Sequence, residues 1–228
     1  MKYTEKYKLK KPDVTDSYNI EDFNENADAI DKALSEKAPA GFGLGTMCKS
    51  VTSIFDIKSN GWWLTNGDTP DGNYWLCLSF TANNTADNNP DTIVIQAKSV
   101  TGNMSARRSK INGVWGPWEW ENPPLGLNTE YRTTERFDKN PVYCKLVLFG
   151  TGPNKTEKSV SHNISRIANV IEWHCYNYNS GTNIEQAPGV DYITVNKTDM
   201  IISSVATTNG NIADWYIYFI IKYTKTTD

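Results

Sequence analysis

The sequence predicts a mainly β protein, in which a short coiled-coil helix near the N-terminus precedes two antiparallel β domains. Residues 22–34, DFNENADAIDKAL, have apolar residues at helical spacing. The rest of the 228-residue chain is rich in Trp, Tyr, Thr and Asn, and Asn-Gly and Asp-Gly pairs typical of hairpin turns separate its apolar runs. Aromatic residues reach 12% and charged residues only 21%, a composition that forms a packed core.

The helix is expected to begin after Asp16 and Ser17, because acidic residues crowd its first turns, where the helix dipole favours negative charge. Pro39 and Gly41 end it. Its apolar residues are spaced three and four apart, as in a coiled-coil seam. The seam consists of Ile20, Phe23, Ala27, Ile30 and Leu34.

A helix this short is marginal alone in water, so its seam needs a partner. Two interpretations stay open: the seam packs on the following domain, or identical helices meet in a short parallel bundle. The β-branched residues Ile20 and Ile30 favour a coiled coil of three helices over one of two. We therefore expect a homotrimer, with residues 1–40 as the attachment segment and trimerising helix.

Residues 41–123 are expected to form a small Trp-rich β module after a linker of small residues, KAPAGFGLGT. Its strands are predicted where apolar runs lie between turn signals such as Asn-Gly, Asp-Gly and Pro-Pro. The predicted ranges are 53–67, 72–80, 89–100 and 104–124.

A weakly patterned segment, 124–136, is interpreted as a linker to the last domain, 137–228. The strands of that domain are predicted at 141–150, 169–178, 214–228 and, as two strands, within 191–206. In the final strand, alternate residues from 215 to 223 share one apolar face, and the residues between them are also largely aromatic or aliphatic. We expect this strand to be central and covered on both faces. The pattern predicts an antiparallel β-sandwich.

Charge and targeting signals limit the function classes. The net charge is −3 with Lys and Arg scattered, which argues against nucleic-acid binding and against a membrane-surface protein. The N-terminus lacks the apolar region of a signal peptide and no apolar run could span a bilayer, so we expect synthesis in the cytosol without membrane insertion. The four widely spaced cysteines, Cys48, Cys77, Cys144 and Cys175, are expected to be free thiols.

The sequence carries no motif for catalysis, metal or cofactor binding. Neither His162 nor His174 has metal-ligand spacing, although three copies of one histidine could meet on a trimer axis. Glu119 and Glu121 would lie about 7 Å apart on one strand, within the range of paired glycosidase carboxylates. Beside a Pro-Pro pair they are better interpreted as solvated edge charges. We therefore expect no enzyme activity and no cofactor.

Aromatic residues offer candidate sites for sugars, because a flat ring can stack on the apolar face of a sugar. Trp118 and Trp120 share one strand face, and neighbouring segments carry Trp62, Trp63, Tyr74 and Trp75. Small β domains commonly bury Trp as core, so a core role is the commoner expectation for these residues. Residues 176–186, which join two predicted strands, combine rigid Tyr with adaptable Asn and Ser, the composition of recognition loops, although an ordinary solvated loop is the other interpretation. The loop candidates are Tyr176, Asn177, Tyr178, Asn179 and Asn183.

Three segments resemble phage proteins. Residues 7–34, YKLKKPDVTDSYNIEDFNENADAIDKAL, resemble the N-terminal segment of tail-fibre and receptor-binding proteins from phages of low-GC Gram-positive bacteria. The Trp-rich pattern GWW…GNYW…SARRSKINGVWGPWEW resembles knob-like modules of pyocin and phage tail fibres. Residues 140–171 and 215–228, which close on YTKTTD, resemble the C-terminal domain of such fibres.

The resemblance implies a homotrimeric adhesin on the tail of a phage or of a phage-tail-like bacteriocin, made in the bacterial cytoplasm and compatible with a prophage origin. Its N-terminus would bind a baseplate or tail protein, and its C-terminal domain a cell-surface polysaccharide. The matched residues Pro141, Gly150, His162 and Ile164 are framework in this family. Two alternatives stay open: a structural tail connector without its own receptor site, and a glycan depolymerase.

Overall fold

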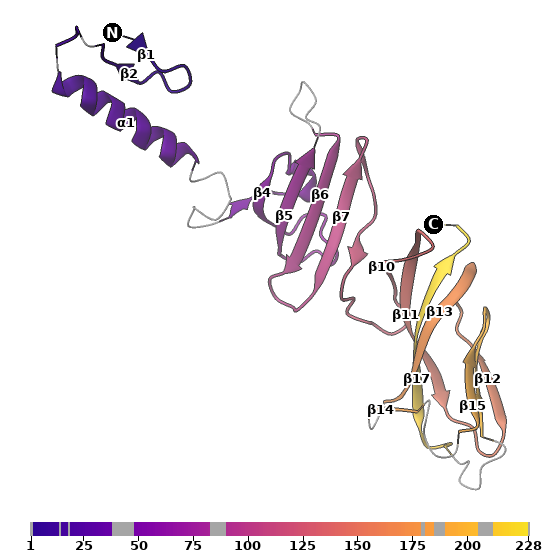
Figure 1. The fold of residues 1–228 in the computed structure, drawn as a ribbon. Helices are drawn as coiled ribbons and strands as arrows, with labels where there is room; N and C mark the ends of the chain where they lie inside the picture. The colour runs from indigo at the N-terminus through magenta and orange to yellow at the C-terminus, as the bar shows by residue number, and fades with distance from the viewer. Residues whose placement is uncertain are drawn as a thin grey trace. The chain divides into compact units, whose positions relative to one another are not determined.

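The computed structural model describes residues 2–13, 15–17, 19–37, 48–82, 90–178, 181–184, 190–204 and 212–227. This described part is mainly β, with one α-helix and several sheets (Figure 1). The chain divides into two compact units, unit 1 (Met1–Ile95 with Lys110–Val114) and unit 2 (Gln96–Ser109 with Trp115–Asp228). Within the described ranges, no helix has the length and apolar character needed to cross a membrane. The predicted division into four segments (1–40, 41–123, 124–136 and 137–228) stays a prediction.

The predicted helix is α1, Ile20–Lys37, in unit 1. The Oδ1 atom of Asn19 accepts a hydrogen bond from the Glu21 N–H at 2.9 Å, which satisfies one of the unpaired donors of the first turn. Before the helix, two short strands, β1 (Lys2–Tyr3) and β2 (Lys10–Lys11), pair as an antiparallel hairpin. The helix is confirmed, and the hairpin is an element that the sequence pattern did not indicate.

In unit 1, β5, β4 and β3 are neighbouring strands in that order. These strands are β3 (Lys49–Ser50), β4 (Gly61–Thr65) and β5 (Trp75–Ala82). Trp63 is 8% exposed, and its Nε1–H donates a hydrogen bond to Ser79 Oγ at 2.8 Å. Trp75 is fully buried and donates to Asp71 Oδ1 at 2.7 Å. These two tryptophans are core residues with satisfied N–H groups, which is the commoner of their two expected roles.

Residues 54–56 form a 3-10 turn, Ile54–Asp56, where the sequence predicted a strand. Ser53 Oγ accepts a hydrogen bond from the Phe55 N–H at 3.1 Å, and the Asp56 carboxylate accepts one from the Ser53 N–H at 3.0 Å. This reciprocal capping box satisfies backbone groups that strand pairing would otherwise use. Buried Ile54 then fixes the turn to the core.

The strands β6 (Thr92–Ser99) and β7 (Ser105–Ile111) lie where the sequence predicted them, and each contributes residues to both units. Two very short strands follow, β8 (Val114–Trp115) and β9 (Glu119–Trp120). In unit 2, β9 pairs with β7 on one side and with β10 (Glu130–Phe137) on the other. The backbone of β9 is therefore paired on both sides.

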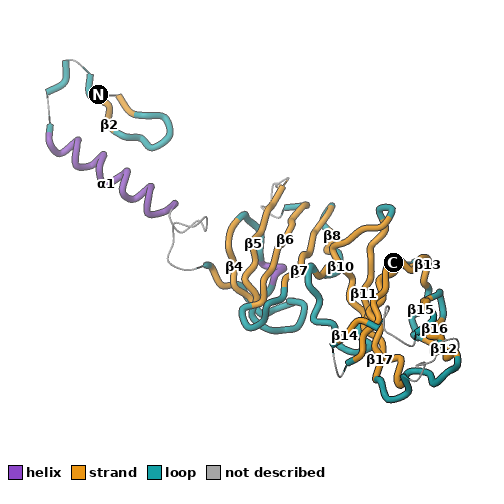
Figure 2. The backbone as a smooth tube through the Cα atoms, turned by 60° about the horizontal axis from the view of Figure 1, so that its bottom comes forward, coloured by secondary structure: helices purple, strands orange, loops and turns teal. Residues whose placement is uncertain are grey.

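The main sheet of unit 2 continues from β10 in the order β10, β11, β17, β13, β14, with antiparallel neighbours. The strands are β11 (Asn140–Thr151), β13 (Ile167–Asn177), β14 (Thr182–Asn183) and β17 (Tyr216–Lys225). A second antiparallel sheet has the order β12 (Glu157–Ser161), β16 (Asp199–Ser203), β15 (Tyr192–Val195). Figures 1 and 2 both show this second sheet beside β13 and β17.

The predicted apolar face of β17 lies in the core of unit 2. Its residues with no exposed surface are Ile217, Phe219, Ile221 and Tyr223. They belong to one cluster with Met200 and Ile202 of the second sheet and with Val147 of β11. One core shared by two antiparallel sheets is the sandwich that the sequence predicted for this part of the chain.

The prediction that β17 is covered on both faces is wrong for the described chain. On its other face, Tyr216 is 50% exposed, and Tyr218 and Ile220 are half-buried. A central position in a sheet and cover on both faces are independent properties. The neighbours β11 and β13 satisfy the backbone of β17, whereas the second sheet packs against one face only.

The segment interpreted as a linker contains β10, which pairs with β11. Charged residues interrupt its apolar pattern, but distant partners bind them. Glu130 accepts hydrogen bonds from Tyr223 Oη and Lys225 Nζ, and Arg132 binds Glu119. A charged side chain that is paired across a sheet does not mark a solvated loop, and pairing of this kind is invisible in local sequence.

All four cysteines are free, as predicted. Cys77, Cys144 and Cys175 are buried, and Cys48 is half-buried. Burial raises the pKa of the Cys77 thiol to about 12 and that of Cys144 to about 11. Both groups therefore remain thiols at neutral pH, and they behave as small apolar residues.

Candidate functional site

The two tryptophans proposed as sugar-stacking residues have different surroundings. Trp120 is 8% exposed, and its ring meets Tyr131 edge-on with centroids 5.6 Å apart. This burial argues against a role for Trp120 in binding. Trp118 is half-buried. The Arg108 guanidinium carbon lies 5.7 Å from the centroid of the Trp118 ring and 5.8 Å from that of the Trp115 ring.

Glu119 is not the solvated edge charge that the sequence suggested. It is 9% exposed, and its Oε1 accepts hydrogen bonds from Arg132 Nε at 3.0 Å and from Arg136 Nη2 at 2.5 Å. Two guanidinium groups thus bind the same carboxylate oxygen of a buried side chain. This arrangement suits a structural ion pair rather than a catalytic acid.

Four tyrosines lie on the exposed face of the main sheet, and we call them the tyrosine face: Tyr176, Tyr178, Tyr216 and Tyr218. Tyr176 lies opposite Tyr218 in the register of β13 and β17. The rings of Tyr178 and Tyr218 are 5.3 Å apart and tilted by 44°. Tyr178 is 72% exposed and Tyr216 50%. The face therefore presents aromatic rings to solvent. Tyr176, Tyr216 and Tyr218 lie in β13 and β17, whereas Tyr178 lies in the turn after β13, where its N–H donates to Tyr216 O at 2.9 Å.

The three asparagines proposed with these tyrosines do not form one set. Asn177 lies on the core side of β13 and is 7% exposed. The backbone of Asn183, in β14, pairs with Tyr176. Asn179 and the side chain of Asn183 lie outside the described residues. Only the tyrosines of the predicted group are therefore placed at a surface by the structure.

A groove of about 370 Å³ opens on the same sheet face as the tyrosines. The sheet contributes Cys144, His174, Ile220 and Lys222, and β10 contributes Thr133 and Glu135. The segment after β9 adds Glu121, Asn122, Pro123 and Leu125. In the register of β13 and β17, His174 lies opposite Ile220, next to the Tyr176–Tyr218 pair. Groove and tyrosine face are therefore continuous along the sheet.

A row of four charged or polar side chains crosses the groove, and we call it the charged row: Glu135, Lys222, Glu172 and His174. Lys222 Nζ donates to Glu135 Oε1 at 2.8 Å and lies 3.1 Å from Glu172 Oε2. His174 Nε2 donates to Glu172 Oε1 at 2.8 Å. Each member is held by its neighbours, so the row is organised before any ligand binds.

These contacts shift the proton affinities of the row. The hydrogen bond to Glu135 raises the pKa of Lys222, and the hydrogen bonds from His174 and Lys222 lower the pKa of Glu172. The lysine is therefore charged and Glu172 ionised at neutral pH. The alternation of residues 169–178 places Glu172 and His174 on one strand face. Their partners Lys222 and Glu135 are distant in sequence and cannot be read from that pattern.

The segment that forms one wall of the groove is fixed to β7. The Glu121 N–H donates to Ser105 O at 2.9 Å, and Asn122 Oδ1 accepts hydrogen bonds from the Ser105 N–H at 2.5 Å and Oγ at 2.8 Å. Asn122 Nδ2 also donates to Asn103 O. The wall is therefore held by hydrogen bonds that do not involve the groove itself.

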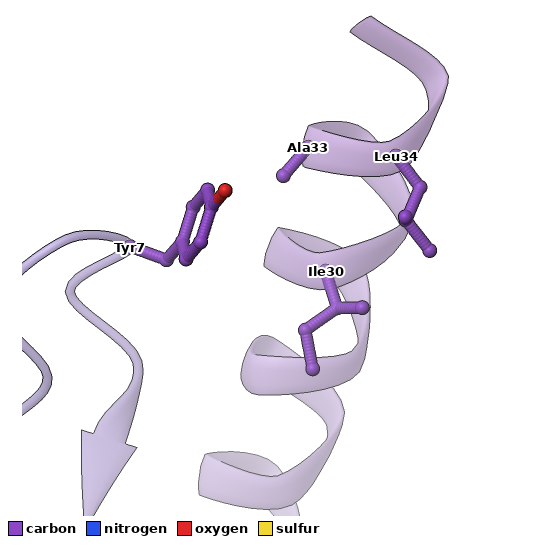
Figure 3. A pocket seen from close by; sticks show the side chains of 4 residues that line it. All are labelled: Tyr7, Ile30, Ala33 and Leu34. Atoms are coloured by element: carbon purple, nitrogen blue, oxygen red, sulfur yellow. The ribbon is translucent and has the colours of Figure 1, made fainter. Parts of the chain in front are cut away.

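The seam of α1 forms a second exposed surface, in unit 1. Exposed fractions along it are 61% for Ile20, 63% for Phe23, 45% for Ile30 and 62% for Leu34. Ala27 is also exposed. Tyr7 of the N-terminal hairpin, together with Ile30, Ala33 and Leu34, lines a small apolar pocket (Figure 3). An apolar stripe of this length at a protein surface is typical of an interface.

The hairpin is joined to α1 by an ion-pair cluster. Lys10 Nζ lies 2.7 Å from Asp22 Oδ1 and 2.5 Å from Glu25 Oε2. Hydrogen bonds to these carboxylates raise the pKa of Lys10. The acidic first turns of α1, expected only to complement the helix dipole, therefore also hold the hairpin that carries Tyr7.

The framework histidine His162 has a structural environment. It is 1% exposed, its Nδ1 accepts a hydrogen bond from the Ile164 N–H at 3.1 Å, and its Nε2 lies 3.2 Å from Asn196 O. Nδ1 is thus unprotonated and Nε2 carries the proton. Among the residues that the structure describes, no group of three or more His, Cys, Asp or Glu side chains is placed to hold a metal ion.

Comparison with known proteins gives only distant likenesses. No family model matches the chain, and no curated protein matches it. An N-truncated R2-type pyocin tail fibre is 10% identical, with 79% of this chain and 98% of that chain covered and a TM-score of 0.27. C-terminal parts of the R1 and R2 pyocin fibres of P. aeruginosa are 12% and 10% identical. They cover 78% and 79% of this chain and 67% of their own, with TM-scores of 0.27 and 0.26. At these TM-scores the likeness carries no argument about fold or function.

Proposed function

We propose that this chain is a non-catalytic, homotrimeric receptor-binding protein that attaches a phage or a phage-tail-like particle to a glycan on the bacterial surface. The observation that carries the proposal is the tyrosine face, where exposed aromatic rings lie beside a groove with charged hydrogen-bonding groups. Tyrosine offers a flat, rigid and amphipathic surface, and the charged groups bind hydroxyls. A sugar ring has an apolar face that stacks on an aromatic ring and hydroxyls that bind charged groups.

The sequence resemblance supports the same proposal from the other end of the chain. Residues 7–34 resemble the attachment segment of tail-fibre proteins, which implies that the N-terminus binds a tail or baseplate protein. The N-terminal hairpin and α1 form a joined element with an exposed apolar seam. We propose that this seam meets the seams of two further copies, as its heptad spacing favours.

Attachment of this kind needs no turnover. Three weak glycan sites on one trimer, and several trimers on one particle, give an avidity far above that of each site. The pairing of Glu119 with two arginines further argues against the Glu119–Glu121 pair as glycosidase carboxylates. A depolymerase would release reducing sugar from host polysaccharide, and we expect none.

The proposal is tested by titrating labelled protein onto a panel of bacterial strains and onto the same cells stripped of surface polysaccharide. We expect saturable binding that stripping removes. Tyr178→Ala should weaken it about ten-fold or more, as truncation of an exposed aromatic contact residue does. Tyr192→Ala, which removes a tyrosine from the second sheet, is the matched control and should bind normally. Equal binding to intact and stripped cells would reject a glycan receptor.

The exposed seam also suits a second function, that of a structural connector in the tail. A connector would bind baseplate or tail proteins through its N-terminal element and would show no affinity for cells. Pull-down with purified tail components, run beside the cell titration, separates the two functions.

A further inference from the structure

The groove has the size of a ligand site and the wrong charge for an acidic ligand. Its volume of about 370 Å³ lies within the range of small-molecule pockets, about 300–1,000 Å³. Leu125, Pro123 and Ile220 provide apolar surface, whereas the charged row provides hydrogen-bonding groups. A pocket that is partly apolar and partly lined by fixed polar groups suits a polyhydroxylated ring.

Carboxylates outnumber cations around this groove. Glu121 and Glu135 line it, and Glu172 binds two of its lining residues, whereas Lys222 is the lysine of the charged row. The charge of Lys222 is matched by two carboxylates at hydrogen-bond distance. A phosphate or uronate group entering the groove would meet a net negative field.

The arginines of β10 do not reverse this balance. Arg132 and Arg136 both donate to Glu119 Oε1. Arg136 Nη1 also donates to the main-chain oxygens of Thr133 and Glu135. Their charge is directed at the buried Glu119 carboxylate.

Preorganisation strengthens the case for a hydroxyl-binding site. The members of the charged row fix one another, and hydrogen bonds to β7 fix the wall. Binding of a ligand therefore loses little side-chain conformational entropy. Carboxylate oxygens retain lone pairs beyond those used in the row, and hydrogen bonds from hydroxyls to ionised groups are among the stronger polar contacts.

Building on the proposed function, we propose that the groove is the saccharide site and that it selects glycans without phosphate or carboxylate groups, with the tyrosine face extending the contact along the sheet. Hydroxyl and amino groups can donate hydrogen bonds to the carboxylates of Glu121, Glu135 and Glu172. These carboxylates repel glycans that bear phosphate or carboxylate groups. The receptor class is thereby narrowed from any surface glycan to an uncharged or amino-bearing one.

The test applies the full-length protein to arrayed bacterial polysaccharides grouped as neutral, amino-bearing, phosphate-bearing and uronate-bearing. We expect binding within the first two groups. Glu135→Gln with Glu172→Gln, at side chains that are 53% and 43% exposed, should fold normally and bind these glycans about ten-fold or more weakly. The same double variant should raise the ratio of affinity for acidic over neutral glycans, which a merely structural role would not do.

Glu157→Gln is the matched control, because it removes one carboxylate from the second sheet, where Tyr192 Oη donates to it. It should leave both affinity and selectivity unchanged. Binding restricted to phosphate- or uronate-bearing glycans would overturn the inference and leave the proposed function standing. So would neutral-glycan binding that the Glu135 and Glu172 substitutions do not weaken. Binding to no arrayed glycan, together with undiminished binding to stripped cells, would overturn both.

Discussion

The side-chain amide of Asn26 forms two hydrogen bonds with the backbone of Lys10. The Lys10 N–H donates to Asn26 Oδ1 at 2.6 Å, and Asn26 Nδ2 donates to Lys10 O at 2.8 Å. The amide thus pairs with β2 as a neighbouring strand would. With the Lys10 ion pairs, it fixes the hairpin on α1 and so fixes Tyr7 beside the seam.

Asn26→Ala should release the hairpin from the helix. Each lost hydrogen bond is worth roughly 1 kcal/mol, so hydrogen exchange at the amides of Leu9 to Lys11 should accelerate about ten-fold or more. Asn24→Ala is the matched control, since Asn24 is an exposed helix residue two positions away. Equal exchange rates in the two variants would show that the amide pairing does not hold the hairpin.

Glu119→Gln should lower the free energy of unfolding by about 1–3 kcal/mol, because it leaves two arginines without their carboxylate. The lower part of that range allows for the partial exposure of Arg136, whose pairing solvent weakens. Urea denaturation followed by Trp fluorescence measures the change. Glu121→Gln, two residues away, should stay within about 0.5 kcal/mol. Equal losses in both variants would contradict a structural role specific to Glu119.

Gly150 is framework by resemblance, and the structure gives a physical reason. Its φ is +87°, and it lies at a register shift in the pairing of β11 with β17, between Leu148 and Gly150. A side chain is strained in this conformation, so Gly150→Ala should cost about 1–2 kcal/mol in thermal or urea unfolding. Gly116→Ala adds a Cβ that would lie 3.5 Å from Ser109 O, an ordinary contact, and should be near neutral. A neutral Gly150→Ala would show that the bulge tolerates other conformations.

Periodicity in the sequence predicted the helix and the core strands β11, β13, β15, β16 and β17, whereas β12 lies outside the predicted ranges. The seam spacing of α1 and the alternation in β17 are local patterns that a buried or apolar face repeats every turn or every second residue. The free cysteines and the core role of Trp63 and Trp75 also followed from residue type.

The groove could not be predicted, because its polar residues act through partners far away in the chain. Lys222 binds Glu135, which is 87 positions earlier. The alternation that placed Trp120 on a strand face could not tell whether that face would be buried, as it is beside Tyr131. Which face a neighbouring strand or layer covers is decided by tertiary packing, and this also explains why β17 is covered on one face only.

His162 should make stability depend on pH. Burial lowers the pKa of the folded-state ring below its ordinary value of 6.5. As pH falls below 6.5, the unfolded state binds a proton first, so the free energy of unfolding decreases, by at most about 1.4 kcal/mol per pH unit. Urea denaturation at pH 7.5 and 5.5 should show this decrease, and His162→Gln should reduce it. An equal decrease in the variant would assign the pH dependence to other groups.

We propose that three copies join through the seam of α1 and together present their sheet faces to the bacterial surface. Sedimentation equilibrium of the full-length protein measures this directly. We expect a mass three times the chain mass of 25.7 kDa, and a smaller mass, with the β units still folded by circular dichroism, for the double variant Ile30→Asp with Leu34→Asp. A stable particle of single-chain mass would contradict the claim, and a trimer that survives both substitutions would move the assembly contact away from the seam.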